Sequence, residues 1–265
     1  MSGNAFGQTS RLSVVTGLHG DRTVLEHLEF TAPFKIMRPF YPPGRMQLML
    51  MTASAGILAG DRQEMHFLVR RDSRAELISQ ACEKLHNMDG GQASRTVQLT
   101  VETGGLLVWH PQPVIPFAGA AFRAELQAEL EPGARLVLAD ILTCGRKAGG
   151  ELFAYRSFEN LVCVRRTGRL IYRDACRFLP AQMDMQGFGL YEGFSHLMNL
   201  QLFGFGTDRA DALRQCLAAA GSAGIRAALT RLQDGDLAVR AFGQNAQSLQ
   251  QLQDSLLETA AVFET

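Results

Sequence analysis

The fold class can be inferred from one segment, Thr96-Val97-Gln98-Leu99-Thr100-Val101-Glu102-Thr103-Gly104-Gly105-Leu106-Leu107-Val108-Trp109. Its first six residues alternate apolar and polar side chains, which is typical of a strand with one buried face. Its last four residues are apolar, as in a strand buried on both faces. The two glycines between them favour a tight turn. The segment therefore predicts two strands joined by a short turn.

The same pattern continues in both directions, up to about Thr207. Turn signals recur after roughly every ten residues, and the runs between them are strand-like. These runs are residues 12–15, 23–26, 46–51, 65–69, 75–78, 122–130, 135–142, 161–166 and 170–173. The first two are expected to form a hairpin. So many short strands predict a layered or coiled all-β body rather than βαβ units, and no fixed-period repeat indicates a solenoid.

The pattern changes after Thr207. A helix capped by Thr207 or Asp208 is expected to end near Gly221, followed by strands at 225–232 and 237–242. A second helix begins at Asn245 and carries one apolar face. We therefore predict one domain, 1–265, that is mainly β with a small α+β layer. A coiled or layered multi-stranded β body (about 10–206) is flanked by a β-α-β-β-α layer with two C-terminal helices (about 207–265).

Charge and composition exclude several classes of protein. The 265 residues contain 26 Lys and Arg against 26 Asp and Glu, and 46% are hydrophobic and 20% charged. A neutral chain is not held to duplex DNA or to an anionic membrane by bulk electrostatics. A chain with this apolar fraction is not intrinsically disordered. We therefore expect a globular protein that binds neither nucleic acid nor membrane.

The five cysteines and six histidines show no spacing typical of disulfide frameworks or zinc sites. His86 and His110 are the better candidate ligands because they flank turns. No signal peptide is recognisable, and the longest uncharged run, 103–122, contains three prolines that exclude a spanning helix. The sequence therefore predicts a cytoplasmic protein with free thiols.

Two glycine-rich segments suggest nucleotide binding but fit it poorly. Gly204-Phe205-Gly206 has Arg209 at the third glycine position of a dinucleotide motif, and no acidic residue follows about 20 positions later. Gly56-Ile57-Leu58-Ala59-Gly60-Asp61 lacks the Lys-Ser/Thr ending of a phosphate loop. We expect both segments to be tight turns.

Two carboxylates and one charged pair are the candidates for chemistry. Asp61 and Asp140 lie in otherwise apolar segments, and a carboxylate there must be paired, bound to a cation or in contact with water. Arg146 and Glu151 flank a short loop and are expected to form an ion pair across it. A β-rich enzyme with a cleft around Asp140, Arg146 and Glu151 is one interpretation.

Several motifs, in order, resemble the urease accessory protein family UreD, called UreH in some systems. They are Gly56-Ile57-Leu58-Ala59-Gly60-Asp61, Ser79-Gln80 with Lys84, Pro111-Gln112-Pro113-Val114-Ile115-Pro116-Phe117, and Gly145-Arg146 with Gly150-Glu151-Leu152-Phe153. The segment Glu83-Lys84-Leu85-His86-Asn87 is most similar to the UreH branch. The resemblance covers nearly the whole chain.

The resemblance implies a non-catalytic chaperone that helps to assemble the nickel centre of urease. It implies that the chain binds UreF directly, the GTPase UreG through UreF, and apo-urease, with a possible dimer of the accessory complex. It also implies an internal polar passage for nickel. No cofactor is expected to bind tightly, and nickel is expected only in transit.

We expect no tight metal site, since a passage must release nickel. The transit candidates are Asp61, Asp140, Glu151 and His86, and the residues expected to line or shape the passage are Gly60, Ser79, Gln80, Lys84 and Arg146. A pure protein–protein adaptor that never handles metal is the second alternative to this interpretation.

Overall fold

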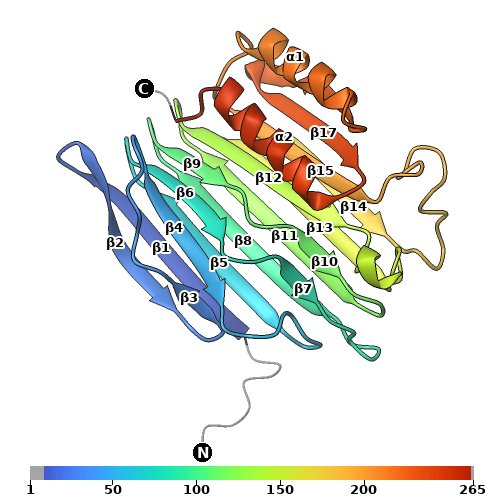
Figure 1. Ribbon diagram of the computed structural model, residues 1–265. Coiled ribbons are helices and arrows are strands. Elements are labelled where there is room, and N and C mark those ends of the chain that lie inside the picture. The colour runs from blue at the N-terminus through green and yellow to red at the C-terminus, as the bar shows by residue number, and fades with distance from the viewer. Residues whose placement is uncertain (1–8, 264–265) are drawn as a thin grey trace, which may run out of the picture.

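A computed structural model describes residues 9–263, which form two packed β-sheets with two helices on one of them (Figure 1). The first sheet has seven strands, in the order β14 (Arg169–Phe178), β13 (Ser157–Arg166), β11 (Ala121–Leu130), β8 (Ala93–Val101), β5 (Arg62–Val69), β1 (Thr9–His19) and β2 (Arg22–Phe30). The second follows the order β16 (Arg226–Arg231), β17 (Leu237–Gly243), β15 (His196–Phe203), β12 (Arg135–Thr143), β9 (Leu106–Trp109), β6 (Arg74–Ser79), β4 (Met46–Thr52) and β3 (Phe34–Ile36). Short strands β7 (Glu83–Leu85) and β10 (Val114–Pro116) pair beside β12.

The middle of the chain is a coil that passes alternately through the two sheets. From β4 to β13, successive long strands lie in opposite sheets, and neighbours within a sheet are parallel. The mainly β, coiled fold is thus confirmed. The coil is solenoid-like, although no fixed period in the sequence indicates it. The repeat is uneven: along the first sheet Arg62 lies opposite Ser94, Ser94 opposite Arg123 and Arg123 opposite Glu159, which are steps of 32, 29 and 36 residues.

The coil turns at one end of the sheets repeat the same backbone conformation. Asp72, Gly104 and Gly133 each lie three residues after the end of a strand of the first sheet and have φ of 57°, 71° and 75°. Left-handed φ values favour glycine, and aspartate is among the few residues that tolerate them. The equivalent position in each turn is therefore one of these two residue types.

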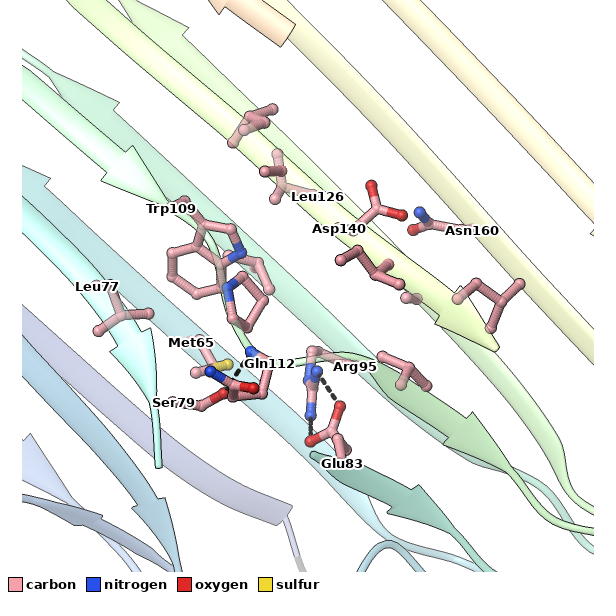
Figure 2. Close-up of a pocket in the computed structure, with 18 of the residues that line it drawn as sticks. Met65, Leu77, Ser79, Glu83, Arg95, Trp109, Gln112, Leu126, Asp140 and Asn160 are labelled. Carbon is pink, nitrogen blue, oxygen red and sulfur yellow. Dashed lines mark hydrogen bonds and ion pairs between the residues drawn. The ribbon is translucent and has the colours of Figure 1, made fainter. Parts of the chain in front are cut away.

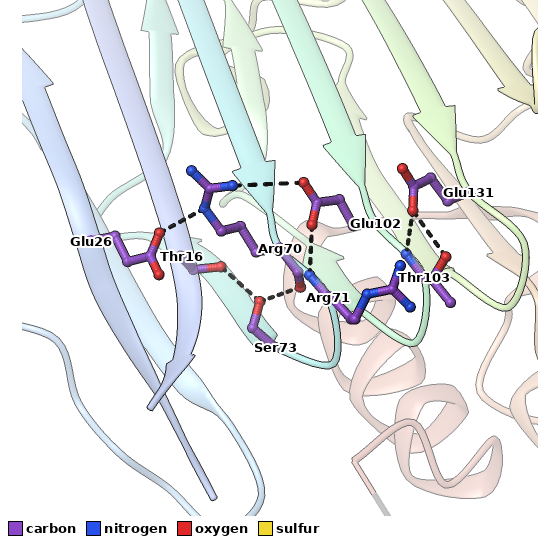
Figure 3. Close-up of polar contacts among 8 residues, drawn as sticks. All are labelled: Thr16, Glu26, Arg70, Arg71, Ser73, Glu102, Thr103 and Glu131. Atoms are coloured by element: carbon purple, nitrogen blue, oxygen red, sulfur yellow. Dashed lines mark hydrogen bonds and ion pairs between the residues drawn. The ribbon is translucent and has the colours of Figure 1, made fainter. Parts of the chain in front are cut away.

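Acidic side chains connect these turns from one coil to the next (Figure 3). Glu102 Oε2 accepts a hydrogen bond from the backbone N–H of Arg71 at 2.9 Å, and Glu131 Oε2 accepts one from that of Thr103 at 2.9 Å. Glu102 and Glu131 follow Val101 and Leu130, which are register partners. Each carboxylate thus satisfies a donor of the preceding turn and helps to fix the register.

Two of the three hydrophobic clusters among residues 9–263 lie on the two faces of the second sheet. One fills the space between the sheets and contains the inward residues of β5, β8 and β11 with Leu77 and Trp109 of the second sheet. The other lies between the second sheet and the helices α1 (Ala210–Gly221) and α2 (Ala246–Thr259). The two short 3-10 helices are η1 (Lys147–Gly149) and η2 (Gln233–Gly235).

The C-terminal layer has the predicted β-α-β-β-α order, β15-α1-β16-β17-α2. Asn245 caps α2, since its side chain accepts a hydrogen bond from the backbone N–H of Ser248 at 2.8 Å. The predicted cap of α1 by Thr207 or Asp208 is wrong: this helix begins at Ala210 with no side-chain cap. No helix within residues 9–263 is long and apolar enough to cross a membrane.

The Gly204-Phe205-Gly206 segment is a tight turn between β15 and α1, as expected. Both glycines have positive φ, of 80° and 72°. A Cβ at Gly204 would lie 2.5 Å from the backbone oxygen of Ala134, whereas one at Gly206 would meet no atom within 4 Å.

We expect Gly204→Ala to lower the free energy of unfolding by more than Gly206→Ala. The Gly206→Ala variant has only the left-handed backbone strain of about 1 kcal/mol. Gly204→Ala must also displace the backbone of Ala134, directly before β12. Urea denaturation of the two variants measures the difference. Equal losses would contradict the close approach at Gly204.

Candidate functional site

A cavity of about 120 Å³ lies between the two sheets (Figure 2). Its wall is mainly apolar and includes Phe34, Met65, Leu77, Trp109, Phe122, Leu126, Phe158 and Val162. The polar side chains that line it are Thr52, Ser79, Glu83, Arg95, Gln112, Glu125, Asp140, Asn160 and Gln201. Because inward side chains from both sheets supply the wall, the coil itself creates this space. We call it the inner cavity.

Asp140 of β12 is a carboxylate of the inner cavity that has no cationic partner in direct contact, as is Glu125. Its Oδ2 accepts a hydrogen bond from Asn199 Nδ2 at 3.1 Å. Burial raises the pKa of Asp140 to about 6, and the charge of Asp174 adds to this effect. The hydrogen bond from Asn199 and the charge of Arg240 act in the opposite direction. The carboxylate therefore changes charge close to neutral pH.

A chain of polar contacts leads from Asp140 to the surface. Asp140, Asn199 and Arg240 are register partners on β12, β15 and β17. Arg240 donates from Nε to Asn199 Oδ1 at 2.9 Å and from Nη2 to Asp174 Oδ2 at 2.7 Å. The Arg240 side chain is half exposed. Asp140 is thus coupled through one amide to an ion pair at the outer boundary of the sheets.

A second cavity, of about 100 Å³, adjoins the first and is called the outer cavity here. The two share the lining residues Leu50, Thr52, Ala81 and Glu83. Gln80 and Lys84 line the outer cavity, and Ser79 lines the inner one. The structure thus brings four predicted site residues, Ser79, Gln80, Lys84 and Asp140, to two adjoining cavities.

Glu83 forms an ion pair with Arg95 at the boundary between the cavities (Figure 2). Arg95 Nη1 donates to Glu83 Oε2 at 2.6 Å, its Nη2 contacts Glu83 Oε1, and its Nε donates to Gln63 Oε1 at 2.9 Å. No motif in the sequence predicted this pair. Its signal was the alternation Arg95, Val97, Leu99, Val101, which places Arg95 on the inward face of a strand.

Asp61 and Gly60 lie in a turn and do not line either cavity. Asp61 Oδ2 accepts a hydrogen bond from the backbone N–H of Leu58 at 2.8 Å, and Gly60 has φ of 84°. The backbone N–H of Gly60 donates to Gln92 O at 2.9 Å. These contacts give both residues a role in closing the turn before β5.

His86, Arg146 and Glu151 gather around Phe117, outside the lining of either cavity. The rings of His86 and Phe117 meet edge-on at 5.0 Å, and the guanidinium of Arg146 lies 4.3 Å from the centre of the Phe117 ring. Arg146 Nε donates to Glu151 Oε2 at 2.9 Å, which confirms the predicted ion pair. His86 Nε2 contacts the backbone oxygen of Ala55 at 3.0 Å.

Ser195, His196 and Lys147 also meet, as nucleophile and base do in some hydrolases. Ser195 Oγ lies 2.9 Å from His196 Nδ1 and 3.0 Å from Lys147 Nζ. Ser195 and His196 are buried, and burial lowers the pKa of His196 to about 4. Lys147 Nζ also donates to Gln244 O at 2.7 Å. None of the three residues lines a cavity. Their contacts tie the η1 loop to Gln244, in the segment before α2.

Within residues 9–263, no group of three or more His, Cys, Asp or Glu side chains could hold a metal ion. The described cysteines are all free. The fold and site together define a coiled two-sheet β-protein with an internal cavity whose mainly apolar wall also carries polar side chains. Asp140 lines this cavity, whereas Arg146 and Glu151 do not, so these three candidate enzyme residues are not assembled in one cleft.

Comparison with known proteins gives the particular family. The family model described as UreD urease accessory protein matches residues 8–264. The chain is 34% identical over 202 residues to urease accessory protein UreD of Acetivibrio thermocellus, covering 76% of this chain and 77% of that one. It is 29% identical over 255 residues to UreH of Helicobacter pylori strain G27, covering 96% and 95%. It is also 32% identical over 202 residues to UreH of Helicobacter hepaticus, covering 76% and 80%.

The chain belongs to the UreD family of urease accessory proteins. Its class is therefore a protein of urease maturation, as the motifs around Asp61, Lys84, Phe117 and Arg146 indicated.

Proposed function

We propose that this protein is a non-catalytic, cytoplasmic chaperone that helps to deliver nickel to apo-urease through its two adjoining cavities. In this proposal it binds UreF directly, UreG through UreF, and apo-urease. The observation that carries the nickel route is the position of Asp140. It is a carboxylate in a mainly apolar cavity whose direct partner is a neutral amide, so it can attract a divalent cation.

Weak ligation suits a conduit better than a tight site. Ni²⁺ accepts oxygen and nitrogen ligands, and transport requires each ligand to release the ion. Ser79, Gln112 and Asn160 offer neutral oxygens along the same cavity as Asp140. The Glu83–Arg95 pair separates this cavity from Gln80 and Lys84. A cation that passes from one cavity to the other must compete with Arg95 for the carboxylate of Glu83.

Two alternatives make different predictions. A pure adaptor between UreF and urease would tolerate neutral substitutions at Asp140. A β-rich enzyme would show turnover as an isolated protein, but the separation of Asp140 from the Arg146–Glu151 pair gives this alternative no assembled cleft.

The test is co-purification with UreF, followed by activation of apo-urease in a reconstituted mixture with UreG, GTP and nickel. We expect this protein to form a stable complex with UreF. We expect that omitting this protein from the mixture abolishes activation of urease. If this protein does not bind UreF, or if urease is fully activated in its absence, the maturation role is contradicted. Asp61→Asn serves as the matched control for Asp140→Asn, because Asp61 lines neither cavity.

A further inference from the structure

Two arginines occupy one rung of the second sheet, at the strand ends nearest the coil turns of Figure 3. Arg74 opens β6 and Arg135 opens β12, and both are register partners of Leu106 on the intervening β9. Residues on one rung point to the same face of a sheet. Leu106 packs in the cluster beneath the helices, so Arg74 and Arg135 leave the sheet on the helix-bearing face. Their Cα atoms are about 10 Å apart, twice the spacing of neighbouring strands.

Neither arginine has a carboxylate partner among residues 9–263. Arg74 Nη1 is buried and has no hydrogen-bond partner. Arg135 lies over the Phe205 ring, at 5.5 Å from its centre. Burial and the neighbouring charge of Arg74 lower the pKa of Arg135. By contrast, the guanidinium of Arg45 is paired with Glu76 at 2.6 Å.

Two uncompensated guanidinium groups side by side repel each other and leave donors unsatisfied. Both costs are removed by an anion that accepts from both groups at once. Guanidinium donors match the oxygens of phosphate and carboxylate groups. The Leu106 side chain between the strands and the Phe205 ring supply an apolar floor, which strengthens charge interactions above it.

We infer that Arg74 and Arg135 form a binding site for a small oxyanion, with Leu106 beneath it. This site is separate from the proposed nickel route, since Ser79 of the inner cavity ends the strand that Arg74 begins. The inference is independent of the proposed function and can be tested on the isolated full-length chain.

Inorganic phosphate is the first probe, titrated calorimetrically into the protein at constant ionic strength set by chloride. We expect one site per chain. Phosphate at ten times its Kd is expected to raise Tm by about 3 °C. Acetate, tested in the same way, distinguishes the source of the oxyanion: tighter phosphate binding assigns the site to phosphates, and equal or tighter acetate binding assigns it to carboxylates.

Arg135→Gln and Arg74→Gln are each expected to weaken the affinity about tenfold or more, because each removes charge-assisted donors. In chloride alone, Arg135→Gln is expected to keep or raise Tm, since it relieves the repulsion. Arg11→Gln is the matched control, because Arg11 is an exposed residue paired with Glu64. No binding of either anion by the wild-type protein, or an equal response of all three variants, would overturn the inference.

Discussion

Replacing Asp140 by asparagine is expected to stabilise the protein at pH 8 by about 3 kcal/mol. The pKa of this carboxyl is raised by burial from 3.8 to about 6, and each pKa unit corresponds to about 1.4 kcal/mol. The folded chain therefore binds more protons than the unfolded chain between these values. Stability falls as pH rises from about 4 to about 6 and stays lower above that range. Asparagine keeps an oxygen for the Asn199 amide but carries no charge.

The measurement is urea denaturation of both proteins from pH 4 to pH 8. The two curves should coincide near pH 4 and separate as pH rises. Asp61→Asn should show no such gain, because the Asp61 carboxylate accepts a backbone hydrogen bond in its turn. If the free energy of unfolding of Asp140→Asn differs from that of the wild-type protein by the same amount at every pH, Asp140 does not carry a buried charge. Under the proposed nickel route, this more stable variant should activate urease less.

Replacing Glu76 by alanine is expected to have the largest destabilising effect, about 3–5 kcal/mol. Glu76 is 3% exposed and accepts from Arg45 Nε at 2.6 Å, Gln47 Nε2 at 2.7 Å and His110 Nε2 at 2.8 Å. Burial alone would raise its pKa, but the hydrogen bonds from His110, Arg45 and Gln47 outweigh burial and lower the pKa to about 2. Alanine would leave Arg45 and His110 without their carboxylate.

The same substitution should loosen α2. Gln253 of this helix contacts His110 Nδ1 through Nε2 at 3.2 Å, and Arg45 lies 3.6 Å from the centre of the Phe263 ring. We expect faster amide hydrogen exchange in α2 of the Glu76→Ala protein. Glu64→Ala is the control, since its exposed pair with Arg11 is worth at most about 1 kcal/mol. A loss no larger than that of Glu64→Ala would show that the buried carboxylate does not anchor the helix.

The stability supplied by Glu76 should also depend on pH. Because its folded pKa is lowered from 4.5 to about 2, the contribution is complete above about pH 4.5 and is lost as pH falls toward 2. In Glu76→Ala this part of the acid transition should disappear.

The sequence predicted the β-body, the C-terminal layer and most strands, because alternation and turn residues are local signals. It left the choice between a layered and a coiled body open and did not predict the parallel strand pairing, since that pairing joins residues about 30 positions apart and the unequal steps hide any fixed period. A remaining signal lies in the turns, where Asp72, Gly104 and Gly133 occupy the same left-handed position, three residues after the end of a strand. Aligning these three residues would have revealed the repeat.

The candidate site was predicted in part for a similar reason. Asp140 stood out because it interrupts an apolar strand, and the structure places it in the inner cavity. Asp61 stood out in the same way, yet it closes a turn, since a sequence cannot show whether a carboxylate faces a cavity or its own backbone. The Glu83–Arg95 ion pair joins a strand of each sheet. It could not be predicted without knowing how the coil places the two sheets against each other.

The most direct test of the proposed nickel route is to fill the inner cavity without changing its charge. Ala124 lines this cavity, and Ala124→Leu adds an apolar side chain there. Nickel-dependent activation of apo-urease would be measured in the reconstituted mixture, with UreF binding and Tm of the variant recorded beside it. We expect the variant to fold, to bind UreF and to activate urease poorly. Full activation by a folded Ala124→Leu protein would contradict a route through the cavity.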